Sequence, residues 1–143
     1  MSTTVLNSNS IAEDLMRYVE TQGVGKQGKD VFAHDWPDFE KTKLSQCIMY
    51  IETSLGTPNR LLSGEVSCQK EYLSLFAKAR SEKAARSLLF PHIEKLDSLH
   101  NVDIGDTTYM SVHAVVPIHY VGTDKNDMYV VEIAFAVLRK PKE

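Results

Sequence analysis

Two runs decide the fold of this chain: Tyr109-Met-Ser-Val-His-Ala-Val-Val-Pro-Ile-His-Tyr-Val121 and Met128-Tyr-Val-Val-Glu-Ile-Ala-Phe-Ala-Val-Leu138. In both, apolar residues recur at every second position, which indicates half-buried β-strands. The predicted apolar faces are Val112, Ala114, Val116, Ile118 and Tyr120 in the first run, and Tyr129, Val131, Ile133, Phe135 and Val137 in the second. Residues 122–127 between the runs are turn-forming and carry no apolar side chain. The sequence therefore predicts a long antiparallel hairpin with one face on a core.

The segments before the hairpin must supply a cover for its apolar face. Ser10-Ile-Ala-Glu13 has the pattern of a capping box, in which a serine hydroxyl accepts from an amide three residues later. A helix is predicted to begin there and to end before Gly23 and Gly25, since glycine commonly terminates helices. We expect this amphipathic helix to pack on the hairpin.

Three strands are predicted in the middle of the chain. Val31–Ala33 is expected to form a hairpin with Gln46–Glu52, a nearly continuous apolar run that is typical of a central strand. Leu55–Gly64 is predicted to be a loop, because its apolar residues show no periodicity. Glu65–Phe76 alternates again and predicts a long strand.

A second helix is predicted after this strand. Ala77–Phe90 is rich in good helix formers, with Ser81 as a possible cap. Pro91 lacks the amide that a helix interior requires, so we expect a break or kink there and a further turn or two. The polar segment His100–Asp106 is predicted to connect this helix to the hairpin.

Together these elements predict an α+β fold. Its sheet is mixed but largely antiparallel and has four to five strands, with two main helices packed on one face. The whole chain, 1–143, is expected to form a single domain, in which residues 1–9 are a flexible N-terminal arm.

Composition places the chain among ordinary globular proteins. Hydrophobic residues make up 43% and charged residues 24% of its 143 residues, and no apolar run approaches the roughly 20 residues of a membrane span. The first residues lack the features of a signal peptide, so synthesis in a cytoplasm is expected. Cys47 and Cys68 are predicted to be buried free thiols, the alternative being a disulfide or a metal pair. The net charge of −3 does not indicate the basic surface with which proteins bind the phosphates of nucleic acids.

The search for catalytic chemistry gives no candidate site. His113 and His119 share a strand face, but their Cα atoms would be about 20 Å apart, too far to share a metal. The spacing of Gly23, Gly28 and Lys29 resembles a phosphate-binding loop, but Asp30 replaces the hydroxyl residue and the segment follows a helix. We therefore predict no catalytic residues, no cofactor and no metal.

The order of motifs resembles the minor capsid or tail terminator proteins of long-tailed bacteriophages. The resemblance extends from about Ile11 to Lys140 and depends on order and spacing rather than on one signature. The segments that carry it are Ile11–Val19, Gly23-Val-Gly25, Gly28–Phe32, Trp36-Pro37, Ile51-Glu-Thr53, Val66–Tyr72 running into Ala79–Leu89, Val116–Asp124, and the final strand with Phe135.

This resemblance implies a non-enzymatic assembly protein of the virion. Such a protein forms a hexameric ring on the head-proximal end of the tail tube, stops polymerisation of the tube and offers a surface for head joining. The implied partners are other copies of the chain, the tail tube protein and a head-completion or connector protein, while DNA passes through without specific binding and no membrane is involved. Two alternatives remain: a head-completion or connector protein that binds the portal side, and a small α+β enzyme or ligand-binding domain.

Under the tail terminator hypothesis, loops that project beyond the sheet are the natural contact surfaces. The predicted interface residues are Trp36, Phe39, Arg60, Leu61, Leu62, Asp124, Lys125 and Asp127. Asp103 and Asp106 are predicted to face the bore of the ring, together with Asp124 and Asp127, because negative charge would keep DNA from adhering.

Overall fold

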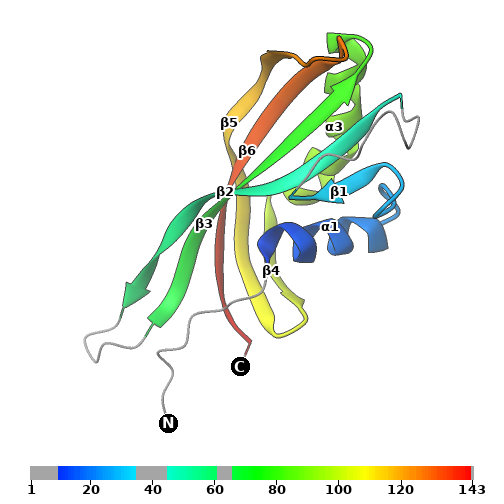
Figure 1. The fold of residues 1–143 in the computed structure, drawn as a ribbon. Helices are drawn as coiled ribbons and strands as arrows, with labels where there is room; N and C mark the ends of the chain where they lie inside the picture. The colour runs from blue at the N-terminus through cyan, green and yellow to red at the C-terminus, as the bar shows by residue number, and fades with distance from the viewer. Residues whose placement is uncertain (1–9, 35–44, 61–65, 143) are drawn as a thin grey trace.

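The computed structural model describes residues 10–34, 45–60 and 66–142. They form an α+β fold in which two helices lie on the same side of a curled, mixed sheet (Figure 1). One hydrophobic core contains side chains from both helices and all strands of the sheet. The N-terminal arm predicted at residues 1–9 lies outside the described residues.

The described elements are α1 (Ile11–Thr21), β1 (Val31–Ala33), β2 (Cys47–Arg60), β3 (Val66–Ala79), α3 (Glu82–Leu96), β4 (Leu99–Ile104), β5 (Thr107–Thr123) and β6 (Tyr129–Pro141). The sheet has six strands in the order β1-β2-β3-β6-β5-β4, one or two more than predicted. All neighbouring strands are antiparallel except β1 and β2, which pair in parallel.

The predicted hairpin is confirmed in β5 and β6, which pair along their length. The apolar face of β6 is confirmed at Val131, Ile133, Phe135 and Val137, which are all buried, but it is wrong at Tyr129, which is exposed. The apolar face predicted for β5 is confirmed at Val112 and in part at Ile118, which packs against the core, but it is wrong at Ala114, Val116 and Tyr120, which are exposed. The register of β5 against β6 shifts at four places, and a shift of one residue exchanges the two faces of a strand.

Helix α1 begins at the predicted cap. The Ser10 Oγ accepts a hydrogen bond from the Glu13 amide at 3.2 Å, and it donates to Glu52 Oε1 on β2 at 2.8 Å. The Ala12 amide also donates to this carboxylate oxygen, at 3.3 Å. Ser10 therefore both caps the helix and joins it to the sheet.

Ser10→Ala is expected to lower the free energy of unfolding by about 2 kcal/mol, because the variant loses the helix cap and leaves Glu52 with one donor fewer. Ser81→Ala is the matched control. The Ser81 Oγ caps α3 by accepting from the Ala84 amide at 3.1 Å in an exposed position, so its loss is expected to cost about 1 kcal/mol. Urea denaturation of both variants measures the difference, and equal losses would contradict the link between Ser10 and Glu52.

Two predictions for the middle of the chain are wrong. β1 and β2 do not form a hairpin, because Val31 pairs in parallel with Ile48. Residues 34–46 separate the two strands, which is enough chain for the crossover that parallel pairing requires. The loop predicted at Leu55–Gly64 is strand up to Arg60, since the pairing of β2 with β3 continues past three register shifts.

The connection predicted at His100–Asp106 is also wrong, because most of it belongs to the edge strand β4. In this edge strand only Leu99 is buried. The predicted cap at Ser81 is confirmed, so α3 begins at Glu82, whereas residues up to Ala79 belong to β3 rather than to the helix. The further turns predicted after Pro91 are also confirmed, since α3 continues through Pro91 to Leu96.

Candidate functional site

The distal half of the β5–β6 hairpin exposes apolar side chains. We define the hairpin surface as Val115, Val116, Tyr120, Val121 and Tyr129, whose exposed fractions are 46%, 40%, 45%, 51% and 37%. The rings of Tyr120 and Tyr129 lie 6.2 Å apart between centroids, so the two strands contribute to one patch. Val116 lies opposite Ala134 and Tyr120 opposite Val131, so the hairpin surface includes side chains on both faces of the sheet. Exposed apolar side chains gathered at one end of a molecule are typical of a protein contact.

The same part of β5 is a free edge of the sheet. β4 pairs with β5 only as far as Val112, and within the described part of the chain no strand pairs with residues 113–123 on that side. The Asp97 carboxylate accepts from the Ala114 amide at 2.9 Å, close to where β4 begins. Pro117 lies farther along this edge and has no amide to donate. The hairpin surface thus combines exposed apolar side chains with unpaired backbone.

The turn beyond the hairpin surface is held in one conformation by Asp124. Its Oδ1 accepts from the amides of Asn126 and Met128 at 2.9 and 3.0 Å, and its Oδ2 lies 2.9 Å from the Lys78 Nζ on β3. Partial burial acts to raise the pKa of Asp124, but hydrogen bonds from Lys78 and from these two amides outweigh it and hold the pKa below its usual range. Asp124 is therefore a residue that shapes the turn.

A chain of hydrogen bonds fixes the distal part of β5 against β6 and β3. The Ser74 Oγ donates to Glu132 Oε2 at 2.7 Å, and Glu132 Oε1 lies 3.2 Å from the Nε2 of His119. The other ring nitrogen of His119 donates to the carbonyl oxygen of Pro117 at 3.0 Å. These contacts order the backbone that carries the hairpin surface.

The predicted interface residues fall into three groups. Trp36, Phe39, Leu61 and Leu62 lie outside the described residues. Arg60 is the last residue of β2, opposite Val66. Asp124, Lys125 and Asp127 lie in the β5–β6 turn, directly beside the hairpin surface.

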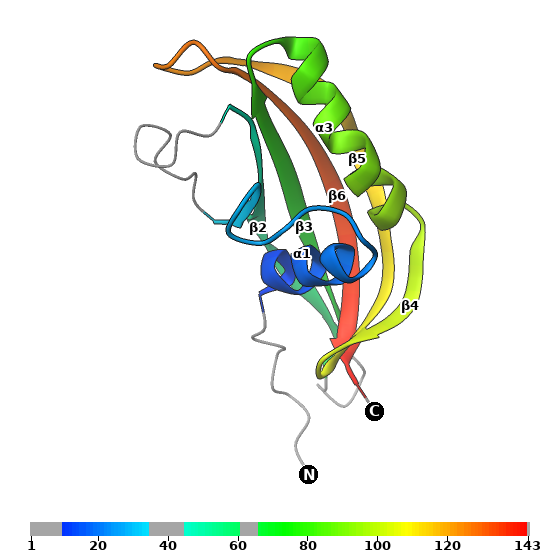
Figure 2. The same cartoon turned by 90° about the vertical axis from the view of Figure 1, so that its right-hand side faces the viewer.

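The residues predicted to line the bore do not lie together. Asp103 is near the end of β4, where its carboxylate accepts from the Thr108 hydroxyl at 2.6 Å, and Asp106 lies in the turn before β5. Asp124 and Asp127 lie at the far end of β5, roughly 50 Å away along the strand. Figure 2 shows these two turns at opposite ends of the molecule. The four carboxylates therefore do not form one acidic cluster.

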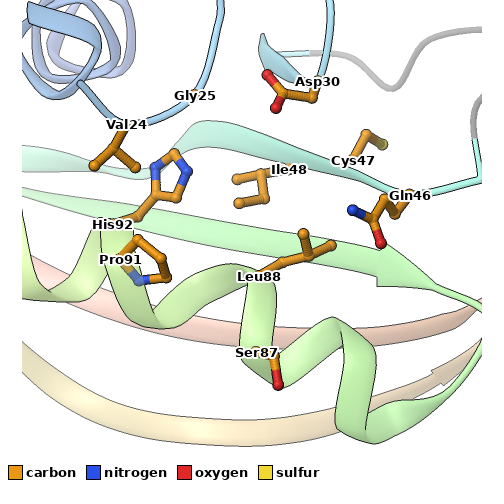
Figure 3. Close-up of a pocket in the computed structure, with 10 residues that line it drawn as sticks. All are labelled: Val24, Gly25, Asp30, Gln46, Cys47, Ile48, Ser87, Leu88, Pro91 and His92. Carbon is orange, nitrogen blue, oxygen red and sulfur yellow. The ribbon is translucent and has the colours of Figure 1, made fainter.

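A cavity of about 200 Å³ lies between α3, β2 and the segment that follows α1 (Figure 3). We refer to it as the His92 cavity. Its apolar lining comes from Val24, Ile48, Leu88 and Pro91, and the exposed residues Asp30, Gln46 and Ser87 lie around it. His92 is 4% exposed, and its Nδ1 lies 2.6 Å from the hydroxyl oxygen of Tyr50, which is fully buried.

The position of His92 is one that helical spacing could have revealed. Ala85, Leu89, His92 and Leu96 recur at intervals of three and four residues, and all four are buried on the sheet side of α3. Burial lowers the pKa of His92 to about 4, although the nearby Asp30 carboxylate acts to raise it. The histidine is thus neutral at pH 7.

The native protein is expected to lose stability as pH falls from 6.5 to about 4. In that window the histidine of the unfolded chain, with its ordinary pKa of 6.5, takes up a proton that folded His92 does not. The loss amounts to about 3 kcal/mol for this group. Urea denaturation at several pH values measures it, and His92→Gln, which does not titrate, should show a smaller slope between pH 6.5 and 5. Parallel slopes in the two proteins would contradict the lowered pKa.

A second cavity, of about 280 Å³, lies over β3, β5 and β6 and is lined in part by Lys70, His113 and Leu138. The prediction of buried thiols is confirmed, since Cys47 and Cys68 are both buried and neither is part of a disulfide. Burial raises the pKa of Cys47 to about 12, so this thiol is not ionised at neutral pH.

Among the described residues, no group of three histidine, cysteine, aspartate or glutamate side chains is arranged to hold a metal ion. No helix in those same ranges is long and apolar enough to cross a membrane. Comparison of the sequence with family models and with curated proteins finds no match.

Proposed function

We propose that this chain is a tail terminator of a long-tailed bacteriophage. In this role, six copies form a ring on the head-proximal end of the tail tube, halt its polymerisation and provide the surface on which the head is joined. The hairpin surface is the observation that carries the proposal, because five apolar side chains and a free strand edge meet at one end of the molecule. The order and spacing of the segments between Ile11 and Lys140, which resemble the terminator family, favour the same role.

The geometry of the hairpin surface suits association between copies. Protein interfaces have an apolar core enriched in aromatic residues and a polar rim. Tyr120, Tyr129 and the three valines supply such a core, while Lys125 and Asp127 of the adjoining turn supply the rim. The ordered turn and the Ser74–Glu132–His119 chain hold this surface in place before any partner binds.

Closure of the ring follows from the type of contact. If the hairpin surface of one copy contacts a different surface of the next, the contact is heterologous, and such contacts close into a ring when the rotation between copies allows it. A closed ring with one face that matches the tube and another that does not ends tube growth. The net charge of −3 suits a bore through which DNA must slide.

Electron microscopy with solution mass measurement tests the proposal. The purified chain is examined alone and mixed with tail tubes that lack their head-proximal cap. We expect six-fold rings, or density at one end of each tube with no further growth. A monomer that ignores the tubes would refute the terminator role, and binding to isolated portals instead would favour a connector protein.

A further inference from the structure

We propose that the His92 cavity binds a small ring compound that carries a hydrogen-bond acceptor and a positively charged amino group. The proposal is independent of ring assembly, since none of the residues that line the cavity belongs to the hairpin surface. It depends on a donor atom of His92, on the apolar lining of the cavity and on a carboxylate at its rim.

The donor is the Nε2–H group of His92. Tyr50 is fully buried, and its hydroxyl lies 2.6 Å from the Nδ1 of His92. A buried phenol needs an acceptor for its proton, and Nδ1 is the acceptor at hand, so we assign the ring proton of the neutral imidazole to Nε2. Within the described residues nothing is hydrogen-bonded to Nε2, although His92 is 96% buried and lines the cavity. Because no described residue accepts from this donor and the ring lines the cavity, its hydrogen bond is completed by an accepting group on a ligand.

The enclosure fits a single ring. Val24, Ile48, Leu88 and Pro91 form its apolar lining, and Figure 3 shows these side chains around the His92 ring. Its volume of about 200 Å³ exceeds the roughly 150 Å³ of an apolar cavity that holds benzene. A mostly apolar lining with a few placed polar groups is typical of a ligand site.

Gly25 keeps this enclosure open beside His92. A Cβ atom at Gly25 would lie 2.6 Å from the Val31 Cγ2 and 3.2 Å from the His92 Cε1. The backbone also has a φ of +74° there, a conformation that other residues rarely adopt. The position of the imidazole thus depends on the absence of a side chain at this point.

Asp30 sets the charge of the ligand. One of its carboxylate oxygens, Oδ1, accepts from the Lys26 amide at 2.7 Å, which orients the group at the cavity rim. The carboxylate lies close enough to His92 to influence its pKa. A negative charge at the rim repels anions and forms charge-assisted hydrogen bonds with an ammonium group.

The test uses tyramine, which joins a phenol ring, a hydroxyl acceptor and an ammonium group. Its binding to the intact protein is followed by NMR at pH 7, through the shift of the His92 ring Cε1 proton. The comparison compound is 4-ethylphenol, which lacks the charge. Because only tyramine can pair with Asp30, we expect it to bind about tenfold more tightly than 4-ethylphenol.

Asp30→Asn should remove this preference by weakening tyramine about tenfold while leaving 4-ethylphenol unchanged. Glu94→Gln is the matched control, since it removes one negative charge from an exposed position on the same helix as His92 and should change neither affinity. Absence of any His92 shift at about 10 mM tyramine, or equal tyramine affinities in Asp30→Asn and the native protein, would overturn the proposal.

Discussion

Replacing Val116 and Tyr120 together by aspartate is expected to abolish ring formation and tube capping while leaving the monomer folded. Both side chains are at least 40% exposed in the free chain, so the charges remain hydrated there and cost little. In a closed interface each carboxylate would be stripped of water without a partner, at a cost of several kcal/mol. Assembly should therefore weaken more than about 100-fold, which sedimentation velocity and electron microscopy with capless tubes can measure.

A second pair of substitutions separates a local effect from a general effect of charge. Phe90→Asp with Asn101→Asp also adds two negative charges at exposed positions, but neither residue belongs to the hairpin surface. We expect this pair to assemble normally, and circular dichroism should be the same for both double variants. If the hairpin variant still forms rings, or if the control pair loses them equally, the hairpin surface is not the contact.

Arg139→Met is expected to lower the free energy of unfolding by about 3–5 kcal/mol, the largest loss that we predict for a single substitution. Arg139 is 3% exposed, and its Nη2 donates to both carboxylate oxygens of Glu71 at 2.9 and 3.1 Å. Methionine fills a similar volume but leaves the Glu71 carboxylate without this donor. Because small domains are stable by about 5–15 kcal/mol, urea denaturation should show a large shift of the midpoint.

The double variant Glu71→Leu/Arg139→Met should recover most of the lost free energy of unfolding, because it removes both charges of the pair together. Lys142→Met provides the surface control. It removes a positive charge at an exposed position near the end of the chain and should change stability by about 0.5 kcal/mol or less. If Arg139→Met lowers the free energy of unfolding by less than about 1 kcal/mol, the ion pair between Arg139 and Glu71 contributes little to stability, as exposed pairs do.

The parts of the fold that could be predicted are those with strong local signals. The alternation of Val131, Ile133, Phe135 and Val137 identified the buried face of β6 because these residues pair in register with β3 without interruption. Ser10 marked the start of α1, since the cap is made within one turn of the chain. The turn between β5 and β6 could be predicted for the same reason, since its polar residues are adjacent in the sequence.

The parts that were missed depend on distant pairing. The parallel register of β1 on β2 is set across residues 34–46, and no pattern within Val31–Ala33 distinguishes a parallel from an antiparallel partner. β4 is an edge strand of the sheet, and most of its side chains are exposed or half-buried. It therefore has too few apolar residues to show a regular alternation. β2 continues to Arg60 because β3 lies alongside it.

The candidate site shows the same division. Residues 122–127 were predicted to project, and the turn does lie beside the hairpin surface. Val116 and Tyr120 were instead predicted to be buried, because a strict alternation of the two faces along the strand does not include the register shifts of β5. Val115 and Val121 were missed for the same reason, whereas His92 carried a usable signal in its spacing from Leu89 and Leu96.

The place of Pro117 in the free edge of β5 bears on how copies of this chain avoid aggregating. A long apolar edge with every amide available is a template on which other chains add strands without limit, as in amyloid. Pro117 removes one amide from that edge, and the register shifts on both sides of it twist the backbone away from a flat ladder. We infer that this edge resists fibril growth even at high protein concentrations.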